Sequence, residues 1–363
     1  MTIVTTGGTM KAAIFYGERD IRVEERPIPE PGPDEVLVRV RSAGICGSDL
    51  LGYNGIGPWQ PPHGVGIEEG HELAGEIAGL GSSVTGLKLG QRVAVQPEHL
   101  IACGSCLECR SGIPHLCKHL GLVAGQPQAS HGFSEYDTCI ASNVWPIPDT
   151  MSLDSAAIAD CYGVALHAVH RAKRVTNQTV AVIGCGTIGL CIGQTARALG
   201  AGRVVLIGDQ PNATATALSS GAADDVVLIP GDDPAVILDR LTDGVGPATI
   251  FEAVGRSGST LEQALQWVAP GGQICVAGTF TTAPRFSPDL AYRKEISLLW
   301  SNSYGLDDGG MPEFEQTLQL IAAGRVHPDA LITHRFPLNQ IAEAFTAANE
   351  KSTTHAIKVV INA

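Results

Sequence analysis

The sequence predicts an α/β protein of two domains, one with a doubly wound parallel sheet and one with an irregular, β-rich fold. In the second half of the chain, short β-branched apolar runs alternate with helical patterns, which is typical of a parallel sheet covered by helices. A glycine-rich turn joins the first of these runs to its helix. The first half instead combines short strands with many prolines and glycines. The length of 363 residues exceeds one average domain and suits two.

Two segments in the first half predict short strands. Residues 35–46 read EVLVRVRSAGIC and residues 92–95 read RVAV, and both contain β-branched residues that favour a strand. Proline and glycine are frequent around them, and these residues favour turns over regular elements. We therefore expect an irregular β-rich domain in this half of the chain.

Composition and charge exclude several classes of protein. Hydrophobic residues make up 44% and charged residues 17%, which is a globular composition. The net charge of −13 disfavours binding to nucleic acid and to anionic membrane surfaces. The sequence has no run of 18 apolar residues, so no membrane span is predicted. The N-terminus lacks the pattern of a secretory signal. We expect a cytoplasmic protein, whose thiols stay reduced.

A loop in the first half holds four of the ten cysteines of the chain. They are Cys103, Cys106, Cys109 and Cys117. Paired disulfides are disfavoured by the reducing compartment and by the very small loops that this spacing would close. An iron–sulfur cluster is the main rival, but the bacterial ferredoxin run has its fourth cysteine after three residues and before a proline. Here seven residues intervene and Lys118 follows, so a tetrahedral zinc held by four thiolates fits better.

Such a zinc would be structural. Gly104 and Gly112 let the backbone bend tightly around the ion, and without metal the thiolates would repel one another. Zinc would therefore hold the loop in its folded form. Structural zinc sites in isolated peptides have apparent binding free energies of about 10–16 kcal/mol. Because four cysteines at 103–117 fill the coordination shell, we expect any active centre to lie elsewhere.

The second half opens with a dinucleotide-binding pattern. Residues 179–184, TVAVIG, predict a buried strand, and residues 188–201 show helical periodicity that stops at a glycine. Between them Gly184, Gly186 and Gly189 form G-x-G-x-x-G. The first glycine allows the tight turn, the second lets the backbone approach a pyrophosphate, and the third allows close packing of helix on strand. A lone glycine pattern is weak, but this context makes it strong.

An acidic residue follows the next strand at the expected distance. Residues 203–209, RVVLIGD, end in Asp209, 20 residues after Gly189. A carboxylate there accepts hydrogen bonds from the adenosine ribose and repels a 2′-phosphate, which favours NAD over NADP. The alternative is that Asp209 only initiates a turn before Pro211.

The alternation of strands and helices continues to the end of this half. Further strands are expected at 224–229, 248–255, 271–280 and 295–301, with a helix at 260–269 among the connections. Ligands bind at the carboxyl ends of such strands, so the turns at 253–255 and 277–280 are expected to face the cofactor. The predicted cofactor-binding residues are Gly184, Gly186, Thr187, Ile188, Gly189, Asp209, Ala253, Val254, Ala277 and Gly278.

The chain after its first nine residues resembles one known family. Its opening, from MKAAIFYGERD to GICGSD, the GHE of 70–72, the four-cysteine loop and the turn VAVIGCGTIG are together highly specific. They resemble the zinc-containing medium-chain dehydrogenases and reductases, which include alcohol, polyol and threonine dehydrogenases. The resemblance implies a GroES-like catalytic domain at 1–155, completed by about 300–363, and a Rossmann NAD-binding domain at 156–299. It also implies two zinc ions per chain, one catalytic and one structural.

The resemblance implies ligands for the catalytic zinc. Cys46 and His71 match two of them, and Asp160, seven residues before His167, occupies the third position. A thiolate, a neutral imidazole and a carboxylate together balance the charge of the zinc ion. Cys161 is the alternative third ligand, but neighbours on a helix point about 100° apart, so only one of the two can easily face the metal. We favour Asp160.

Three further residues match catalytic positions of the family. Ser48 matches the residue that takes the proton of the alcohol, and Asp49 would hydrogen-bond His71 and fix its tautomer. Glu72 matches a carboxylate near the metal, a candidate for a transient ligand. Many alcohol dehydrogenases have a histidine five residues after the first zinc cysteine, whereas this chain has Leu51. The proton relay beyond Ser48 is therefore open, with water near Ser48 and the cofactor ribose as one route.

The predicted substrate is a secondary alcohol. A carboxylate zinc ligand resembles the polyol branch, so we expect hydride transfer between NAD and the CH–OH group of a polyol, cyclitol, sugar or amino sugar. Tyr53, Asn54, Trp59 and His63 are candidates for the substrate side of the site, or belong to a plain surface loop. Threonine or a simple secondary alcohol is the alternative substrate, and a non-catalytic dinucleotide-binding protein is the alternative class.

The remaining cysteines and several histidines are expected to have no ligand role. Cys139, Cys185, Cys191 and Cys275 lie in apolar contexts and are expected to be buried packing thiols. His99, His170 and His334 are expected in the core or on the surface. Family analogy predicts a homodimer or homotetramer joined through the cofactor domains. The net charge predicts no nucleic-acid or membrane partner.

Overall fold

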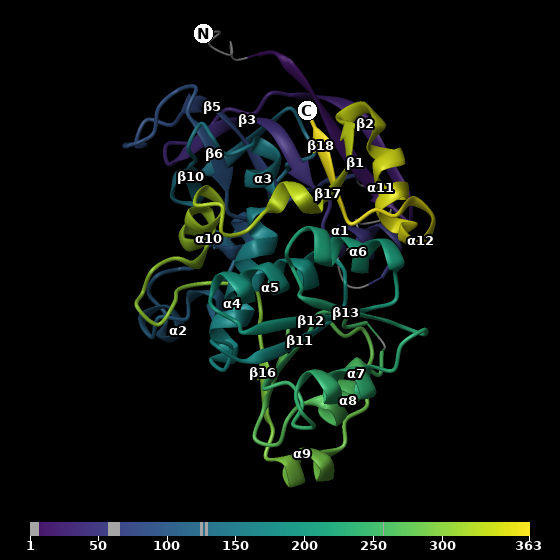
Figure 1. The fold of residues 1–363 in the computed structure, drawn as a ribbon. Helices are drawn as coiled ribbons and strands as arrows, with labels where there is room; N and C mark the ends of the chain where they lie inside the picture. Colours follow the sequence, from purple (N-terminus) through teal and green to yellow (C-terminus); the bar gives the residue numbers. More distant parts are fainter. Residues whose placement is uncertain (1–6, 57–65, 124–125, 128–129, 257) are drawn as a thin grey trace. The chain divides into compact units, whose positions relative to one another are not determined.

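The computed structural model describes residues 7–56, 66–123, 126–127, 130–256 and 258–363. The chain forms two compact units, and each is described by itself. The first unit comprises Met1–Asp160 and Ile332–Ala363, and the second comprises Cys161–Leu331. Both ends of the chain therefore belong to the first unit (Figure 1).

The first unit is a β-rich fold, as predicted. Its main sheet has seven strands in the order β10-β6-β5-β3-β18-β17, with β9 also paired to β3. These strands are β3 (Glu35–Gly44), β5 (Glu72–Leu80), β6 (Arg92–Val95), β9 (Tyr136–Ile140), β10 (Val144–Pro146), β17 (Ile332–Pro337) and β18 (Lys358–Asn362). A second sheet has the order β2-β1-β4, formed by β1 (Thr9–Gly17), β2 (Asp20–Pro27) and β4 (Ile67–Glu68), and β7 (Leu122–Val123) pairs with β8 (Gln126–Pro127).

Alternation along β3 places the core of this unit. Val36, Val38 and Val40 are almost fully buried and Arg39 is exposed, as expected where one face of a strand is buried, while Leu37 on the other face is buried as well. Strand β18, from the end of the chain, pairs antiparallel with the end of β3 and lies beside it in Figure 1. The C-terminal strand thus completes the sheet next to the segment that begins at Ile45.

Short helices connect or cover these strands. They are α1 (Gly47–Tyr53), α2 (Leu107–Arg110), α3 (Leu153–Ala157), α11 (Ile341–Asn349) and α12 (Lys351–Thr354). Helix α4 (Ala159–Ala172) begins in the first unit and continues in the second, because the boundary falls after Asp160.

The second unit is a doubly wound parallel sheet, as predicted. All six strands are parallel and follow the order β13-β12-β11-β14-β15-β16, which reverses direction between β11 and β14. The strands are β11 (Thr179–Ile183), β12 (Arg203–Gly208), β13 (Asp225–Leu228), β14 (Thr249–Glu252), β15 (Gln273–Val276) and β16 (Ser297–Trp300). The helices are α5 (Thr187–Ala198), α6 (Pro211–Ser219), α7 (Pro234–Leu241), α8 (Thr260–Trp267), α9 (Pro288–Lys294) and α10 (Glu313–Ala322).

Helices cover both faces of this sheet, so its central strands are buried throughout. Ala181 and Ile183 of β11 share a core with Leu261 and Leu265 of α8. Val180 and Val182, which alternate with them, are equally buried, and α5 packs against β11 and β12. Burial on two sides explains why these strands read as continuous apolar runs in the sequence (Figure 1).

Residues 301–331, which follow β16, belong to the second unit. From the sequence, we expected the catalytic domain to resume at about residue 300. Glu313 at the start of α10 accepts hydrogen bonds at 2.8 Å from Nδ1 of His167 and Nδ1 of His170, both on α4. His327 N donates to Gln194 Oε1 of α5 at 2.7 Å. These tertiary contacts join residues 301–331 to α4 and α5, and the return to the first unit comes at Ile332.

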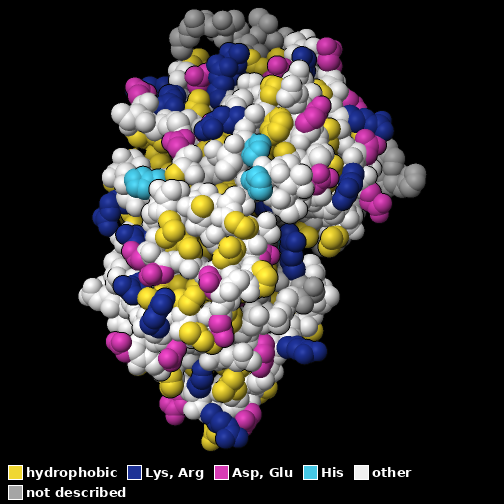
Figure 2. All heavy atoms as spheres, turned by 45° about the vertical axis from the view of Figure 1, so that its right-hand side comes forward, with side chains coloured by type: hydrophobic (Ala, Val, Ile, Leu, Met, Phe, Trp, Pro, Cys, Tyr) yellow, Lys and Arg dark blue, Asp and Glu magenta, His cyan; other side chains and the backbone are white. Residues whose placement is uncertain are grey.

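The visible surface mixes side chains of every kind. Acidic and basic side chains are interspersed on the face in Figure 2, with apolar side chains between them. Exposed large apolar residues of the second unit include Tyr292, Val236 and Trp300. Among the described residues, none of the helices has the length and apolar character needed to span a lipid bilayer.

Candidate metal and cofactor sites

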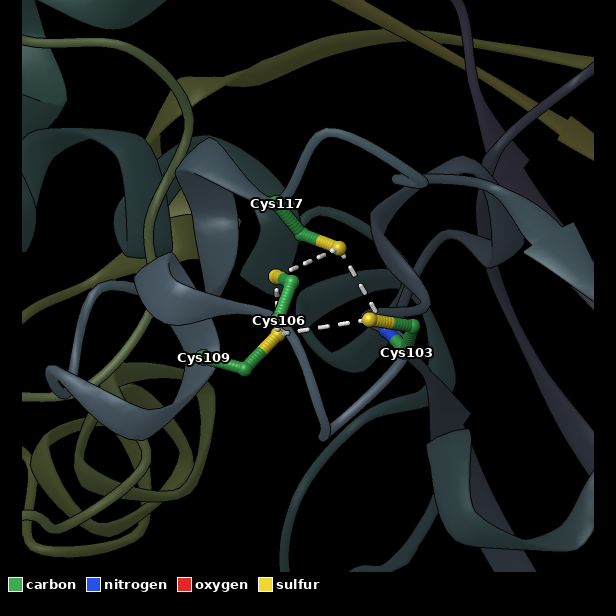
Figure 3. Close-up of side chains that lie close together, drawn as sticks. All are labelled: Cys103, Cys106, Cys109 and Cys117. Atoms are coloured by element: carbon green, nitrogen blue, oxygen red, sulfur yellow. Dashed lines mark hydrogen bonds between the residues drawn. The ribbon is translucent and has the colours of Figure 1, made fainter.

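The four cysteines of the loop point their sulfur atoms toward one another (Figure 3). The Sγ of Cys106 lies 3.3 Å from that of Cys109 and 3.6 Å from that of Cys117, and Cys103 Sγ is 4.0 Å from Cys109 Sγ. A tetrahedral zinc with bonds of about 2.3 Å holds its sulfurs about 3.8 Å apart. Disulfide sulfurs would be about 2.0 Å apart. A cluster of two or four irons would spread the four cysteines over different irons, so some of their sulfurs would lie farther apart than the 4.8 Å within which all four fall here. One zinc therefore fits best.

Tight turns and N–H donors shape this loop. Gly104 and Gly112 have φ of +70° and +78°, so the backbone bends at both places as expected. The N–H groups of Cys103 and His119 donate to Cys117 Sγ at 3.5 and 3.3 Å. A hydrogen bond from the Ser105 N–H lowers the pKa of Cys103 to about 5. The Ser105 N–H thus favours the thiolate of Cys103, the form in which cysteine binds zinc.

A second set of metal-ligating groups lies in the first unit. One ligand atom each of Cys46, His71 and Glu72 fall within 4.8 Å of one another. Cys46 is the N-cap of α1, and His71 and Glu72 come directly before and at the start of β5. The pairing of β3 with β5 brings Gly44 opposite Glu72, which carries the two sequence segments together.

Asp49 organises this set. Its Oδ2 accepts a hydrogen bond from the N–H of Cys46 at 2.7 Å, and its Oδ1 lies 3.6 Å from Nδ1 of His71. Burial raises the pKa of Asp49. Because Nδ1 of His71 faces Asp49, Nε2 remains available to a metal, which is the arrangement that fixes a histidine ligand in one tautomer.

Negative groups converge on His71. Burial lowers the pKa of this imidazole, but the charges of Asp49, Cys46 and Asp160 outweigh burial and raise it well above its ordinary value. Asp160 is 8% exposed in the first turn of α4. The charge of Asp160 therefore lies close enough to raise the pKa of His71. The carboxylate that falls within 4.8 Å of both Cys46 and His71, however, is that of Glu72. Cys161, the next residue, is buried at 2% exposure.

Glu72 is tied to a buried lysine that the sequence analysis did not single out. Glu72 forms an ion pair with Lys358 of β18, whose Nζ also donates to the carbonyl of Ile45 at 2.9 Å. Both side chains are 2% exposed or less. A Cβ at Gly44 would lie 2.1 Å from Oε2 of Glu72, so a glycine is needed there. The sequence did carry a signal for this ion pair. Lys358 lies inside the apolar run of 356–361, and a charged residue in a buried strand needs a partner of opposite charge.

Ser48 and two further polar residues lie around the ligands. Ser48 is exposed in the first turn of α1, next to Cys46 and Asp49, so its hydroxyl is accessible. The ring of His99 meets the ring of His71 edge to face with centroids 5.5 Å apart. Burial, together with the charge of Asp49, raises the pKa of Glu69 to about 7. The structure thus brings His99 and Glu69 to the site, which the sequence analysis did not predict.

Two residues expected on the substrate side have other roles in the structure. Tyr53 is 6% exposed and its ring packs on Phe345 with centroids 5.2 Å apart, so it is a core residue. The Asn54 amide donates to Leu50 O and to Asn349 Oδ1, both at 2.7 Å, and ties α1 to α11. We therefore no longer expect Tyr53 or Asn54 to bind the substrate. The other two candidates, Trp59 and His63, lie outside the described residues.

The glycine-rich turn has the geometry that a pyrophosphate needs. Gly184 has a φ of +113°, and a Cβ at Gly189 would lie 1.8 Å from Gly184 O, so helix and strand pack closely. A Cβ at Gly186 would meet nothing within 4 Å, which leaves open space at the N-cap of α5. Thr187 and Ile188 form the first turn of this helix and are partly exposed. Its N-terminal N–H groups therefore present an anion site.

The other predicted cofactor residues lie at the same edge of the sheet. Asp209 follows β12 and is exposed. Burial and the charge of Asp209 raise the pKa of Cys185 to about 12, so the carboxylate lies near the glycine-rich turn. Val254 is 39% exposed after β14. The remaining residues, Ala253, Ala277 and Gly278, are partly exposed after β14 and β15.

The remaining thiols and histidines lie as the sequence suggested. Cys139, Cys185, Cys191 and Cys275 are all buried. His170 pairs with Glu313, and the ring of His334 stacks on Phe336.

Comparison with known proteins finds matches to both units. Residues 32–149 match the family "Alcohol dehydrogenase GroES-like domain", and residues 187–323 match "Zinc-binding dehydrogenase". The chain is 32% identical to sorbitol dehydrogenase of Bacillus subtilis, over 95% of each chain. It is 32% identical to L-threonine 3-dehydrogenase of Bacillus licheniformis, over 93% of this chain and 95% of that one. The solved structure of galactitol-1-phosphate dehydrogenase from Escherichia coli has a TM-score of 0.86 at 28% identity, over 98% of this chain and 100% of that one.

Proposed function

The chain belongs to the zinc-dependent medium-chain dehydrogenase family, and on that premise we propose that it oxidises a secondary hydroxyl of a polyol, cyclitol, sugar or amino sugar with NAD. Its relatives are enzymes that act on CH–OH groups, so it is an alcohol oxidoreductase that uses zinc and a nicotinamide cofactor. The observation that carries the proposal is the gathering of Cys46, His71 and two acidic side chains beside the exposed hydroxyl of Ser48.

The residues of the first unit would hold the metal and handle the proton. Cys46 and His71 supply a thiolate and an imidazole, and Asp49 keeps the imidazole oriented. When bound there, zinc supplies a Lewis acid that lowers the pKa of a hydroxyl, as it lowers that of water from about 15.7 to about 7. Ser48 accepts the proton of the substrate hydroxyl. Because Ser48 is exposed, its own proton can pass to solvent, which offsets the lack of a histidine at Leu51.

The third ligand of this zinc is proposed to be Asp160. Its charge already acts on His71, and it occupies the third ligand position of the family. Glu72 is the alternative, because its carboxylate is nearer to both ligands. The Lys358 ammonium competes with a metal for Glu72, since it neutralises this carboxylate in the ion pair. This competition favours Asp160 as the lasting ligand and leaves Glu72 for a transient role.

The second unit would bind the cofactor at its glycine-rich turn. The open space at Gly186 and the N-terminus of α5 suit a pyrophosphate. Asp209 is proposed to accept the ribose hydroxyls, which favours NAD over NADP. When bound, the cofactor supplies the nicotinamide ring that accepts the hydride.

The substrate class rests on the relatives and on the carboxylates near the metal. Sorbitol and galactitol 1-phosphate, named for two relatives, are polyols or their derivatives, while L-threonine, named for a third, is the alternative. The test is NADH formation, followed by absorbance, with cyclitols, amino sugars, open-chain polyols, threonine and ethanol. We expect the highest kcat/KM for a polyol, cyclitol or sugar. A clear preference for ethanol or another small primary alcohol would contradict the proposal.

We also propose that the protein is a homodimer or homotetramer, by analogy with its family. Light scattering after size-exclusion chromatography measures the mass of the assembly against the 37.8 kDa of one chain. A single species with the mass of one chain at micromolar concentration would contradict this.

A further inference from the structure

Glu252 is a fully buried acidic residue at the end of β14, in the centre of the parallel sheet. It is 0% exposed and follows Ile250 and Phe251, which belong to the apolar core. Strand β14 adjoins β11 at the point where the strand order reverses. In open α/β sheets, ligands bind outside the carboxyl ends of the strands at such a point. An acidic side chain is therefore buried next to the expected cofactor position, where it needs hydrogen-bond donors to be tolerated.

The donors come from the turn that follows β14 and from the next helix. Oε1 of Glu252 accepts hydrogen bonds from the N–H of Val254 at 3.0 Å and from the N–H of Gly255 at 2.8 Å. It also accepts one from Oγ1 of Thr260, the first residue of α8, at 2.9 Å. A single oxygen atom thus holds the turn in a curled form and ties it to the start of α8.

The same residue also holds the turn after β15. The main-chain carbonyl of Glu252 accepts hydrogen bonds from the N–H groups of Ala277 at 2.9 Å and Gly278 at 3.0 Å. The side-chain Oε2 lies against Gly278, where a Cβ would be 2.5 Å away. Glu252 therefore contacts both turns that are expected to face the cofactor.

These turns leave no room for a side chain at their glycines. A Cβ at Gly278 would lie 2.4 Å from Gly255 N, and one at Gly255 would lie 2.3 Å from Thr279 O. A Cβ at Gly184 would lie 2.9 Å from Cγ2 of Val254, so the glycine-rich turn is packed against the same place. Val254 nevertheless remains 39% exposed at the tip of its turn, where a ligand can contact it. The three turns are therefore in close contact with one another.

We propose that Glu252 is a positioning residue that sets the two turns after β14 and β15 in the shape that binds the nicotinamide half of the cofactor. The inference rests on the proposed cofactor site of the second unit. The pyrophosphate and adenosine half is assigned to other groups, namely the N-terminus of α5 and Asp209. Glu252 should therefore affect one half of the cofactor and not the other.

The test compares two ligands that differ by the nicotinamide. The dissociation constant of NADH is measured by its fluorescence, and that of ADP-ribose by calorimetry, on the metal-loaded full chain. Glu252→Ala should weaken NADH binding about tenfold, equivalent to about 1.4 kcal/mol, and leave ADP-ribose binding unchanged. Glu252→Gln keeps an acceptor for the three donors and should retain most of the NADH affinity. If Glu252→Ala does not fold, Thr260→Val decides, with NADH binding about twofold to threefold weaker because one of the three donors to Oε1 of Glu252 is lost.

A matched control comes from the same unit. Glu313 is also buried and also accepts three hydrogen bonds, from His167, His170 and the N–H of Gly305. Glu313→Ala should lower the melting temperature but leave both dissociation constants unchanged. Equal weakening of both ligands by Glu252→Ala, or no weakening of either, would overturn the inference while the cofactor site stands. Failure of the wild-type protein to bind NADH would overturn the proposed cofactor site and this inference with it.

Discussion

Single side chains prepare the metal-ligand set of the first unit before any metal binds. Asp49 joins the N–H of Cys46 to Nδ1 of His71, so one carboxylate orients two ligands. Lys358 neutralises Glu72 and bonds to Ile45 O, one residue before Cys46. Because Asp49 and Lys358 are buried, water competes little for the hydrogen bonds and ion pairs through which they hold the candidate ligands.

The third zinc ligand is open to a direct test at the residue scale. Asp160→Ala should release the catalytic zinc and leave the structural one, so that elemental analysis finds one zinc per chain in place of two. Cys161→Ala should keep both zinc ions and most activity, because its thiol is not expected to face the metal. The opposite result for the pair would assign the ligand to Cys161. Loss of zinc with Glu72→Ala alone would assign it to Glu72.

Ser48 should matter for proton transfer and not for metal binding. Ser48→Ala is expected to lower kcat by about 10²–10⁴-fold, the range for loss of a general acid or base. The zinc content should not change, because a hydroxyl next to the ligands is not itself a ligand. Steady-state kinetics with the best polyol and elemental analysis measure the two quantities. A Ser48→Ala enzyme with normal kcat would remove Ser48 from the proton path.

Asp209 should set the choice between NAD and NADP. Asp209→Ala removes a charged hydrogen-bond acceptor and should weaken NAD binding by about 10- to 100-fold. Discrimination against NADP should relax, because a carboxylate no longer faces the 2′-phosphate. Ratios of kcat/KM for the two cofactors measure the effect. A wild-type enzyme that prefers NADP would refute this role for Asp209.

At the scale of elements, we expect the cysteine loop and α1 to have separate roles, one structural and one catalytic. The loop holds four sulfurs at the spacing of a closed zinc site, whereas α1 presents Cys46 at its N-cap beside the exposed Ser48. Cys106→Ser should therefore lower the melting temperature, while Cys46→Ser should abolish turnover and leave the melting temperature nearly unchanged. Calorimetry and kinetics on both variants make the comparison. Identical behaviour of the two variants would contradict the division into a structural and a catalytic site.

Helix α10 is joined to α4 by Glu313, and this junction should depend on pH. Hydrogen bonds from His167 and His170 outweigh burial and lower the pKa of Glu313 from 4.5 to about 2. A carboxylate whose pKa is depressed on folding stabilises the fold above its unfolded pKa, and the contribution is lost as the pH falls toward about 2. The stability difference between wild type and Glu313→Gln should therefore shrink by about 1 kcal/mol between pH 6 and pH 3.5. Urea unfolding at the two pH values measures it, and a constant difference would contradict the assignment.

For the whole molecule, one chain combines two sets of candidate metal ligands with one parallel α/β sheet. The first unit carries both cysteine-containing sites, and the second carries the glycine-rich turn and Asp209. The division is chemical as well as structural, because thiolates and carboxylates are metal-ligating groups, whereas the carboxyl edge of a parallel sheet suits a dinucleotide. On the proposed function, the first unit would bind the alcohol and the second would bind the hydride acceptor.

The short-range patterns of the sequence determined the parallel sheet, the glycine-rich turn and the four-cysteine loop. Each depends on spacing within about 30 residues, and local backbone geometry turns such spacing into structure. The period of the strands and the positive φ of Gly184 follow from the same local rules.

Only the tertiary structure decided which distant groups meet. The pairing of β18 with β3 brings Lys358 to Glu72, and the packing of α10 on α4 assigns 301–331 to the second unit. The sequence also did not predict that Tyr53 packs against Phe345, or that two turns gather around Glu252. These contacts join segments that are far apart in the chain or depend on which side chains are buried. No local pattern encodes them, because the free energy of burying a charge depends on partners that only the folded chain supplies.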